Sequence, residues 1–356
     1  MPTVSVLLIS SETLPNVLFI KEFPAEQYVF ITTRKMEEEG RSHWIISSAG
    51  IEKIRVKCIV EVNQDNFENI LQSLENAQLQ PTADWVVNIT CGNKLMSIAA
   101  FNFFARYHSR IFYLAVGNQH FEQLFPYNNL HPIKYKLNLK EYFNAYGRNY
   151  ESQPQINIPD ALGEASKIME SCRGAKGIIR ESSYLNQKLN EYTKGKLRQF
   201  FSGSWFEFYV YETIQKYLNL PASNISLSTA IYLMDSKKVH TSDTKDNDID
   251  VCFVYKNYLY LMECKVYTGQ KNVSLQDSVV TTGVGNIQSH LYKLAAVKQP
   301  LGLSVRAYLI TPNNLRANSA SFEAIEKRCK ILQINQPIDY QILQSEDSFK
   351  KFLDKL

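Results

Sequence analysis

The sequence lacks any hydrophobic run that approaches the ~20 consecutive apolar residues of a membrane-spanning helix. Its first residues, MPTVSVLLISS, also lack the basic region and the small-residue cleavage site of a signal peptide. The six cysteines are scattered and form no CxxC pair, so buried free thiols are their expected state. These absences favour a cytoplasmic protein with no membrane partner.

A marked excess of one charge is also missing. The 39 Lys and Arg residues against 35 Asp and Glu residues leave a net charge of +4, and the pI is near 8.5. This balance permits nucleic-acid binding without arguing for it, because a strong basic footprint has a pI above ~9 with clustered bases. With 356 residues, 45% of them hydrophobic, and no repeat, the composition indicates an ordinary globular chain of two domains.

Strand-like and helical patterns alternate through roughly the first 135 residues. Strands are predicted at about 4–10, 28–33, 55–62, 85–90 and 110–117, with helices over 13–23, 35–48, 65–78 and 93–106. The first run, VSVLLIS, is continuously apolar, as in a strand buried on both faces. The alternation is typical of βαβ units and predicts a parallel, Rossmann-like sheet.

The pattern changes after about residue 118. NQH and PYNN are predicted as turns, LKEYFNAYG as a short helix ending at Gly147, and ESQPQINIPD as a linker. Further helices are predicted at 160–174, 183–200, 204–218 and 286–298, with strands at 225–233, 249–255, 258–266 and 306–312. We therefore expect three regions: residues 1–140, a helical linker region over 141–195, and a mixed α/β domain over 196–356.

A hairpin in the last region carries the most specific chemistry. NDIDVCFVY (247–255) and YLYLMECK (258–265) flank a two-residue turn, so Tyr255 is expected to face Tyr258 and Asp250 to face Glu263. Lys265, two residues beyond Glu263, lies on the same face of this hairpin. Opposed and partly desolvated carboxylates repel each other and have raised pKa values.

A divalent cation would remove this conflict. Mg²⁺ and Mn²⁺ take hard oxygen ligands and often bind one or two carboxylates together with a substrate phosphate. Such an ion lowers the pKa of a bound water and neutralises charge on the phosphate, while a neighbouring lysine stabilises the developing negative charge. An alternative is a surface hairpin whose lysine pairs with one acid, and a shift of one residue in register would separate the acids. His240 and His290 are further candidate bases that this chemistry does not require.

The spacing D250-x12-E263-C-K265 resembles the core of the PD-(D/E)XK nucleases, the restriction-endonuclease-like enzymes. The resemblance implies a metal-dependent endonuclease in which Asp250 and Glu263 hold the metal and Lys265 is catalytic. It also implies an acid on a helix before the hairpin, for which Glu207 is the candidate and Glu212 the less favoured substitute. Ser204-x-x-Glu207 also fits a capping box at a helix start, which is the structural alternative for Glu207.

The tract NITCGNK (88–94) follows a predicted strand and opens a helix. Free backbone N–H groups at a helix N-terminus, a glycine and a lysine make a plausible phosphate cradle at the carboxyl end of a strand. A strand-to-helix turn that needs only a glycine and a capping residue explains the same tract. Neither a P-loop nor a complete GxGxxG pattern is present.

The tract SSETLPN (10–16), together with NITCGNKLMSIAAF, resembles the CARF domain, a CRISPR-associated Rossmann-like sensor. A CARF domain followed by a PD-(D/E)XK domain resembles the ancillary nucleases of type III CRISPR systems. The resemblance implies a homodimer that binds a cyclic oligoadenylate across its two-fold axis, with cyclic tetra-adenylate as the commonest activator and hexa-adenylate as the alternative. The ligand-binding residues that it implies are Ser10, Ser11, Glu12, Thr13, Asn16, Thr32, Thr33, Thr90, Gly92, Asn93 and Lys94.

Together the two resemblances imply an allosteric nuclease that acts on single-stranded RNA or DNA, with nicking of duplex DNA as an additional activity. Trp205, Tyr267 and Tyr292 are candidates for stacking on bases, and Lys293 for contact with phosphate, against the alternative that all four serve packing. Two other functions remain open at this point. One is a ligand-responsive regulator without cleavage, and the other is a ring nuclease that degrades its own activator.

Overall fold

The computed structural model describes residues 1–79, 82–152, 158–234, 248–267 and 284–356. Contacts divide the chain into two compact units. The first comprises Met1–Asn149 with the short segments Leu233–Asp235 and Leu301–Ser304, and the second comprises Tyr150–Tyr232, Ser236–Pro300 and Val305–Leu356. Within the described ranges, none of the helices combines the length and the apolar character that crossing a bilayer requires.

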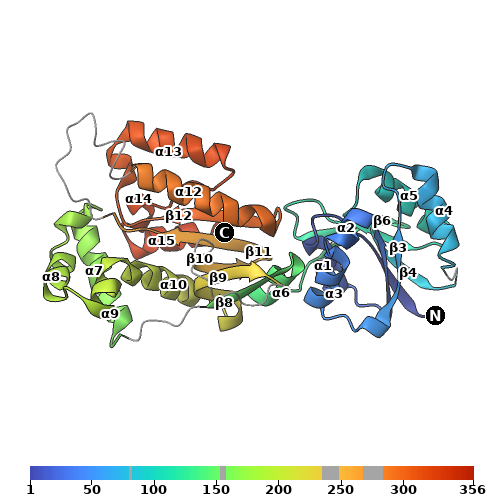
Figure 1. Cartoon of the computed structure of the whole chain (residues 1–356), viewed down its shortest axis with the longest axis horizontal. Helices are drawn as coiled ribbons and strands as arrows, with labels where there is room; N and C mark the ends of the chain where they lie inside the picture. The colour runs from blue at the N-terminus through green and yellow to red at the C-terminus, as the bar shows by residue number, and fades with distance from the viewer. Residues whose placement is uncertain (80–81, 153–157, 235–247, 268–283) are drawn as a thin grey trace. The chain divides into compact units, whose positions relative to one another are not determined.

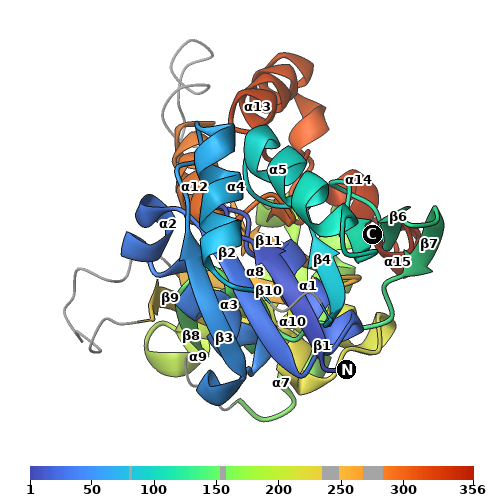
Figure 2. The ribbon, with the colours of Figure 1, turned by 90° about the vertical axis from the view of Figure 1, so that its right-hand side faces the viewer.

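The first unit contains a seven-stranded sheet of order β3-β2-β1-β4-β5-β6-β7. Its strands are β1 (Thr3–Leu8), β2 (Gln27–Thr32), β3 (Val56–Glu61), β4 (Asp84–Asn88), β5 (Arg110–Tyr113), β6 (His120–Phe125) and β7 (Asn129–Pro132). The five strands predicted as a parallel sheet pair in parallel, as expected. Figure 2 shows β3, β2, β1 and β4 side by side.

The antiparallel extension β5-β6-β7 was not predicted. The tract PYNN does supply the turn between β6 and β7, as expected, but the strands on either side went unrecognised. The burial of β6 alternates along HFEQLF, which is the period-two signal of a half-exposed strand. That strand is short and polar, so its sequence pattern is weak.

Helices cover both faces of this sheet (Figure 1). They are α1 (Leu14–Glu22), α2 (Arg34–Glu38), α3 (Arg41–Ala49), η1 (Lys53–Arg55), α4 (Phe67–Asn76), α5 (Lys94–Ala105) and α6 (Leu139–Ala145). The single helix predicted over 35–48 is wrong, because it divides into α2 and α3 at Gly40. This glycine has φ of +78°, a left-handed conformation that ends a helix and that other residues adopt at a cost.

The second unit contains a five-stranded sheet of order β12-β11-β10-β9-β8. Its strands are β8 (Arg148–Ser152), β9 (Ile225–Leu233), β10 (Asp248–Tyr255), β11 (Tyr258–Cys264) and β12 (Val305–Ile310). Strand β10 pairs antiparallel with both β9 and β11, and β12 pairs parallel with β11. The expected mixed α/β architecture is therefore confirmed.

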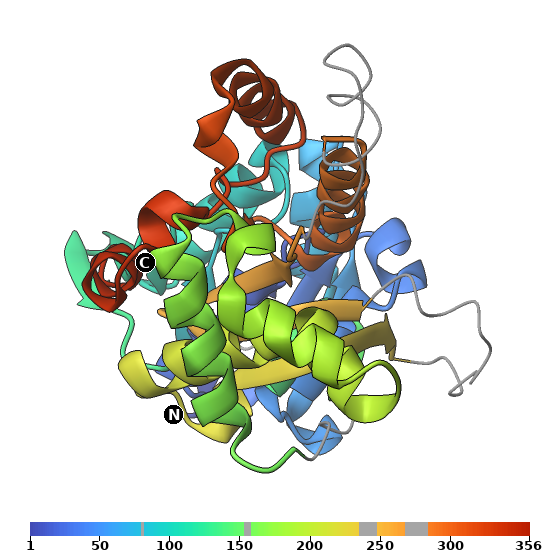
Figure 3. The same ribbon diagram turned by 90° about the vertical axis from the view of Figure 1, so that its left-hand side faces the viewer.

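The helices of the second unit are α7 (Ala161–Gly174), η2 (Ile179–Glu181), α8 (Ser183–Glu191), α9 (Gly195–Gln199), η3 (Phe200–Ser204), α10 (Trp205–Tyr217), η4 (Ala222–Asn224), α12 (Val284–Lys298), η6 (Gln299–Leu301), η7 (Leu315–Ala317), α13 (Ser319–Ile331), α14 (Tyr340–Leu343) and α15 (Glu346–Leu353). Figure 3 shows α7 to α10, in green to yellow-green, gathered on one side of this unit. The single helix predicted over 183–200 is wrong. Tyr192 adopts an extended backbone after α8, and Gly195, with φ of +81°, begins α9.

Candidate active site and ligand pocket

The hairpin formed by β10 and β11 has the register predicted from the sequence. Tyr255 pairs with Tyr258 and Val251 with Met262, so the next pair along the ladder is Asp250 with Glu263. The turn residues Lys256 and Asn257 have φ of +50° and +61°. Two positive φ values are typical of a tight two-residue turn whose twist matches that of its strands. The local turn therefore places two carboxylates side by side.

Lys265 joins these two carboxylates. Its Nζ lies 2.8 Å from Oδ2 of Asp250 and 2.9 Å from Oε1 of Glu263. The backbone N–H of Cys264 donates a second hydrogen bond, of 2.7 Å, to Oδ2 of Asp250. The backbone N–H of Lys265 also donates to the carbonyl oxygen of Ile310 on β12, which fixes the lysine at the end of the sheet. Burial alone would lower the pKa of Lys265, but the negative charges of Asp250 and Glu263 raise it well above its usual value, so this lysine remains charged.

Glu263 is the most deeply buried charged group of the site, with 1% of its side chain exposed. Besides Lys265, two side chains of α12 face it: Nδ1 of His290 and Nζ of Lys293 both lie 3.4 Å from its Oε1. Burial alone would raise the pKa of Glu263, but the hydrogen bond from His290 and the charges of Lys265 and Lys293 lower it to about 2. Glu263 is therefore ionised, and it needs these partners because an unpaired buried charge is very costly.

Sequence reasoning singled out His290 and Lys293 only weakly, and it did not connect them with Glu263. Their spacing of three residues on a predicted helix was the available signal, because residues i and i+3 share one face. His240, the other histidine considered, lies outside the described residues.

Glu207 lies in the first turn of α10. Burial and the negative charge of Asp250, with a further contribution from Glu263, raise its pKa to about 8. Burial and the charge of Glu263 also raise the pKa of Asp250, against the opposing effect of Lys265. Ser204 makes no side-chain capping hydrogen bond, so the capping box considered for Ser204 and Glu207 does not form. The three acids therefore share one electrostatic environment.

Asp250 and Glu263 offer the hard carboxylate oxygens that Mg²⁺ and Mn²⁺ prefer. Among the residues described, no three His, Cys, Asp or Glu side chains converge closely enough to hold a metal by themselves. The donor set still fits such an ion, because Mg²⁺ commonly binds one or two carboxylates and completes its shell with water and substrate phosphate. Burial is the largest cause of the raised pKa values of Glu207 and Asp250, and the negative charge of neighbouring carboxylates, the second cause, is one that a bound cation would relieve.

A separate cavity of about 740 Å³ opens in the first unit at the carboxyl ends of its parallel strands. Its lining comes from the segments that follow β1, β2, β3 and β4. The chain adds β2 and β3 on one side of β1 and then β4 and β5 on the other side, so the strand order reverses between β1 and β4. Open α/β sheets place ligands at such a switch point. The lining residues are Ile9, Ser10, Ser11, Thr33, Arg34, Lys35, Met36, Glu61, Val62, Asn63, Gln64, Asp65, Asn69, Ser73, Gly92, Asn93 and Met96.

Five of the residues predicted to bind a ligand line this cavity: Ser10, Ser11, Thr33, Gly92 and Asn93. The structure places the other six, Glu12, Thr13, Asn16, Thr32, Thr90 and Lys94, outside the lining described for it. Polar residues that follow β2 and β3 complete the lining, among them Arg34, Gln64 and Asp65, and sequence reasoning missed them. Their position directly after apolar strands was the signal that could have indicated them.

Asn16 and Thr90 support the backbone around the cavity. The buried Nδ2 of Asn16 donates a hydrogen bond of 2.7 Å to the carbonyl oxygen of Leu8, and its Oδ1 accepts from Asn88 at 2.8 Å. Oγ1 of Thr90 accepts the backbone N–H of Leu114 at 2.8 Å. These bonds tie the ends of β1, β4 and β5 together and so fix the loops that line the cavity.

Glu12 faces another part of the same unit. Its Oε2 accepts hydrogen bonds of 3.1 Å from the hydroxyl of Tyr146 and from the backbone N–H of Leu303. These contacts give the carboxylate protein donors, so it is not forced against an anionic ligand.

Family comparison assigns both halves of the chain. Residues 4–142 match the family described as Card1 CARF domain, and residues 194–333 match the family described as Card1-like, endonuclease domain. The chain is a CARF–endonuclease fusion of the Card1 type. No curated protein shows significant similarity to its sequence.

Solved structures share the fold of this CARF–endonuclease fusion. Can2 from Sulfobacillus thermosulfidooxidans, in complex with cyclic tetra-adenylate, superposes with a TM-score of 0.71 at 20% identity over 99% of both chains. Protein VC1899 from Vibrio cholerae gives 0.69 at 18% identity over 99% of this chain and 98% of its own. A type III CRISPR defence DNA nuclease activated by cyclic oligoadenylate gives 0.57 at 14% identity, over 87% of this chain and 46% of its own.

In the endonuclease domain, the aromatic residues considered for base stacking differ in access. Trp205 is fully buried in the core and Tyr267 has a buried hydroxyl group. Tyr292, on α12, is 48% exposed, and Arg328 donates a hydrogen bond to its hydroxyl. Of these three side chains, Tyr292 therefore has the most open surface for a base, Tyr267 is partly exposed and Trp205 has none.

Proposed function

We propose that this protein is an endonuclease that cyclic oligoadenylate activates and that cleaves single-stranded RNA or DNA with Mg²⁺ or Mn²⁺, with nicking of duplex DNA as an additional activity. The observation that carries the proposal is the buried arrangement of Asp250, Lys265 and Glu263 in a domain of the Card1-like endonuclease family. Two structurally similar proteins support it, one bound to cyclic tetra-adenylate and one a type III CRISPR defence nuclease. Defence in a type III CRISPR system is the role that we infer.

In this proposal Asp250 and Glu263 hold the metal, which supplies Lewis-acid neutralisation of the phosphate and a more acidic water. An oxygen of water forms a bond to phosphorus, the phosphorus–oxygen bond to one sugar breaks, and that sugar oxygen takes up a proton. Lys265 stabilises the negative charge that develops on the phosphate. Glu207, when ionised, accepts the proton of the attacking water on its carboxylate.

For the sensor we propose that residues 1–140 bind the cyclic oligoadenylate, that 141–195 form a helical connection and that 196–356 cleave. The eleven residues predicted from the sequence act either in the cavity or in the loops around it. Cyclic tetra-adenylate is the proposed activator, and a homodimer would bind it because a two-fold-symmetric ligand suits an interface of two identical surfaces. Lys35 and Arg34 of the lining add positive charge for its phosphates.

Cleavage of fluorescent single-stranded RNA and DNA tests the proposal. The reactions contain Mg²⁺, Mn²⁺ or EDTA, and cyclic tetra-adenylate, hexa-adenylate or no activator, with wild type and Glu263→Gln. Glu323→Gln on α13 is the matched control, because its carboxylate pairs only with exposed Lys327 in the described structure. We expect cleavage that requires both metal and activator and that Glu263→Gln abolishes.

Absence of cleavage under every combination, with ligand still bound, would overturn the nuclease and favour a regulator. Loss of the added cyclic oligoadenylate without cleavage of the other substrates would favour a ring nuclease.

A further inference from the structure

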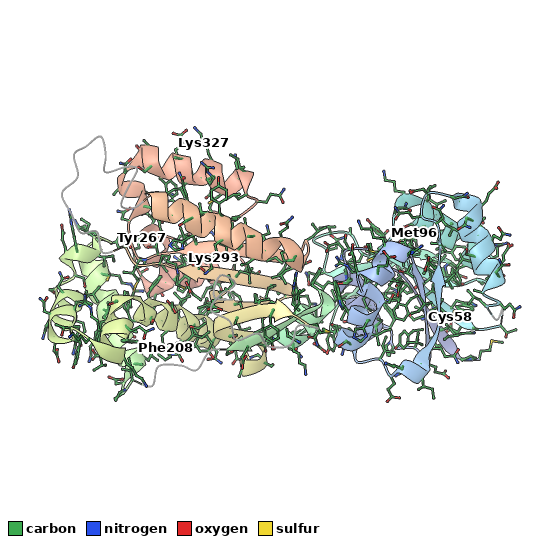
Figure 4. The ribbon with its side chains drawn as sticks, viewed as in Figure 1. Cys58, Met96, Phe208, Tyr267, Lys293 and Lys327 are labelled. Carbon is green, nitrogen blue, oxygen red and sulfur yellow. The ribbon has the colours of Figure 1, made fainter. Side chains whose placement is uncertain are left out.

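Helix α12 brings a second lysine to the buried carboxylate of Glu263. Nζ of Lys293 lies 3.4 Å from Oε1 and 3.5 Å from Oε2, so it contacts both oxygens of this group. Figure 4 labels Lys293 on α12, the helix that covers β11 and β12. Glu263 therefore has one lysine from its own strand and one from the helix above it.

The two lysines are held differently. Lys265 bridges two carboxylates at 2.8 and 2.9 Å, which is the normal length of a charge-assisted hydrogen bond. Lys293 contacts one carboxylate at distances about half an ångström longer than that normal range. Its side chain is also somewhat more exposed, at 30% against 23% for Lys265. Lys293 is thus the cation that can leave Glu263 most easily and reach toward solvent.

The charge balance of the site indicates how Lys293 could act during cleavage. A metal ion held by Glu263 would neutralise the charge that the lysines balance without it, so one of the cations would become surplus at the carboxylate. Nucleic acid then brings negative phosphate oxygens to the same place. A long, flexible ammonium group with three donors suits a move from a carboxylate to a phosphate oxygen.

We propose that Lys293 is a second cationic catalytic residue of the endonuclease site, which neutralises Glu263 before substrate binds and contacts a non-bridging oxygen of the scissile phosphate during cleavage. This inference rests on the proposed nuclease function. Negative charge on the non-bridging oxygens changes as the water attacks, and a positioned donor at such a place contributes on the order of 100-fold or more to the rate. His290, the other α12 contact of Glu263, has a short rigid ring and stays with the carboxylate.

The test compares Lys293→Gln and Lys293→Arg with wild type, all with saturating activator. Lys327→Gln is the matched control, because Lys327 is an exposed lysine on α13 that pairs with Glu323 (Figure 4). We expect Lys293→Gln to lower kcat about 100-fold with less than about a threefold change in KM, which marks an interaction made in the transition state. Lys293→Arg retains part of the activity because it keeps the charge, and Lys327→Gln behaves as wild type.

A second measurement needs no cleavage. Titration calorimetry of Mn²⁺ without nucleic acid should show tighter binding to Lys293→Gln, by about tenfold, because a positive charge beside Glu263 is removed. A lysine that merely supported the fold would leave Mn²⁺ binding unchanged or weaken it, and that result would overturn the inference. Wild-type kcat in Lys293→Gln would overturn it as well.

Glu263→Gln, measured in parallel, separates the two proposals. If Glu263→Gln is inactive while Lys293→Gln keeps the wild-type kcat, only the role of Lys293 fails. If Glu263→Gln is as active as wild type, the proposed nuclease site itself fails.

Discussion

At the residue scale, the stability of the active site depends on matched charges in a dry environment. Glu263 is ionised and almost fully buried, and the positive charge of Lys265 pairs with both Glu263 and Asp250. Removing one partner of a buried ion pair leaves the other charge without compensation, which costs more than the pair contributes.

Lys265→Met should therefore lower the free energy of unfolding by about 3 kcal/mol. The double variant Lys265→Met with Glu263→Gln should regain part of that loss, because the uncompensated charge of Glu263 is gone while Asp250 still lacks its lysine. Urea unfolding of the wild type, the two single variants and the double variant in EDTA measures this coupling. Additive losses would show that the pair makes no mutual contribution.

Glu207 leads to a prediction about pH. Its pKa of about 8 in the folded protein lies above the ordinary value near 4.5, so the folded state holds a proton that the unfolded state has lost. Stability therefore falls as pH rises from about 4.5 to 8, and below that window the group makes no difference. Glu207→Gln lacks this penalty and should stabilise the metal-free protein by roughly 1–3 kcal/mol at pH 8.

Thermal melts of wild type and Glu207→Gln in EDTA at pH 4.5 and pH 8 check this sign. Equal melting temperatures of wild type and Glu207→Gln at pH 8 would contradict the raised pKa of Glu207. Glu323→Gln serves as the control, because its exposed carboxylate is paired with Lys327 in the described structure.

At the element scale, the turn between β4 and α5 depends on a glycine. Gly92 has φ of +80°, and a Cβ atom there would lie 3.2 Å from Cβ of Met96. Asn93 follows and caps α5, since its Oδ1 accepts the backbone N–H of Met96 at 2.9 Å. Both residues line the cavity, so the shape of the turn sets the shape of one wall.

Gly92→Ala should lower the free energy of unfolding by roughly 1–2 kcal/mol, because a left-handed conformation strains any residue with a Cβ atom. It should also weaken binding of cyclic tetra-adenylate, by about tenfold, as the displaced turn changes the wall. Titration calorimetry and urea unfolding measure the two effects. Gly174→Ala, at the end of α7 where a Cβ atom meets nothing within 4 Å, is the matched control.

At the scale of the whole molecule, the protein has two compact units with separate hydrophobic cores. One core joins β1 to β5 with α4 and α5, and the other joins β9 to β12 with α7, α10 and α15. Ligand and metal are proposed to bind in different units, so each should stabilise its own unit most directly.

Scanning calorimetry tests this separation. Cyclic tetra-adenylate at about 100 times its dissociation constant should add about 2.7 kcal/mol to the unit that binds it and raise one unfolding transition. Mn²⁺ alone should raise the other transition. A single transition that both ligands shift equally would show that the two units unfold together.

Sequence patterns determined part of this structure by themselves. The register of the β10–β11 hairpin followed from a two-residue turn and from alternation, because these are local properties of the chain. The pairing of Asp250 with Glu263 followed from the same rules, and the parallel pairing of β1 to β5 followed from the alternation of strands and helices, although the order of these strands was not predicted. The breaks at Gly40 and before Gly195 escaped prediction, because a helical pattern continues across both positions while the backbone does not.

Tertiary structure alone decided which side chains meet. His290 and Lys293 reach Glu263 because α12 packs on β11, a contact between segments far apart in the sequence. In the same way, Arg34 and Asp65 line the cavity while Thr90 supports it, because the paths of several loops decide which polar groups face the open space. Local pattern specifies the direction of a side chain from its own strand or helix, but only packing brings it to its partner.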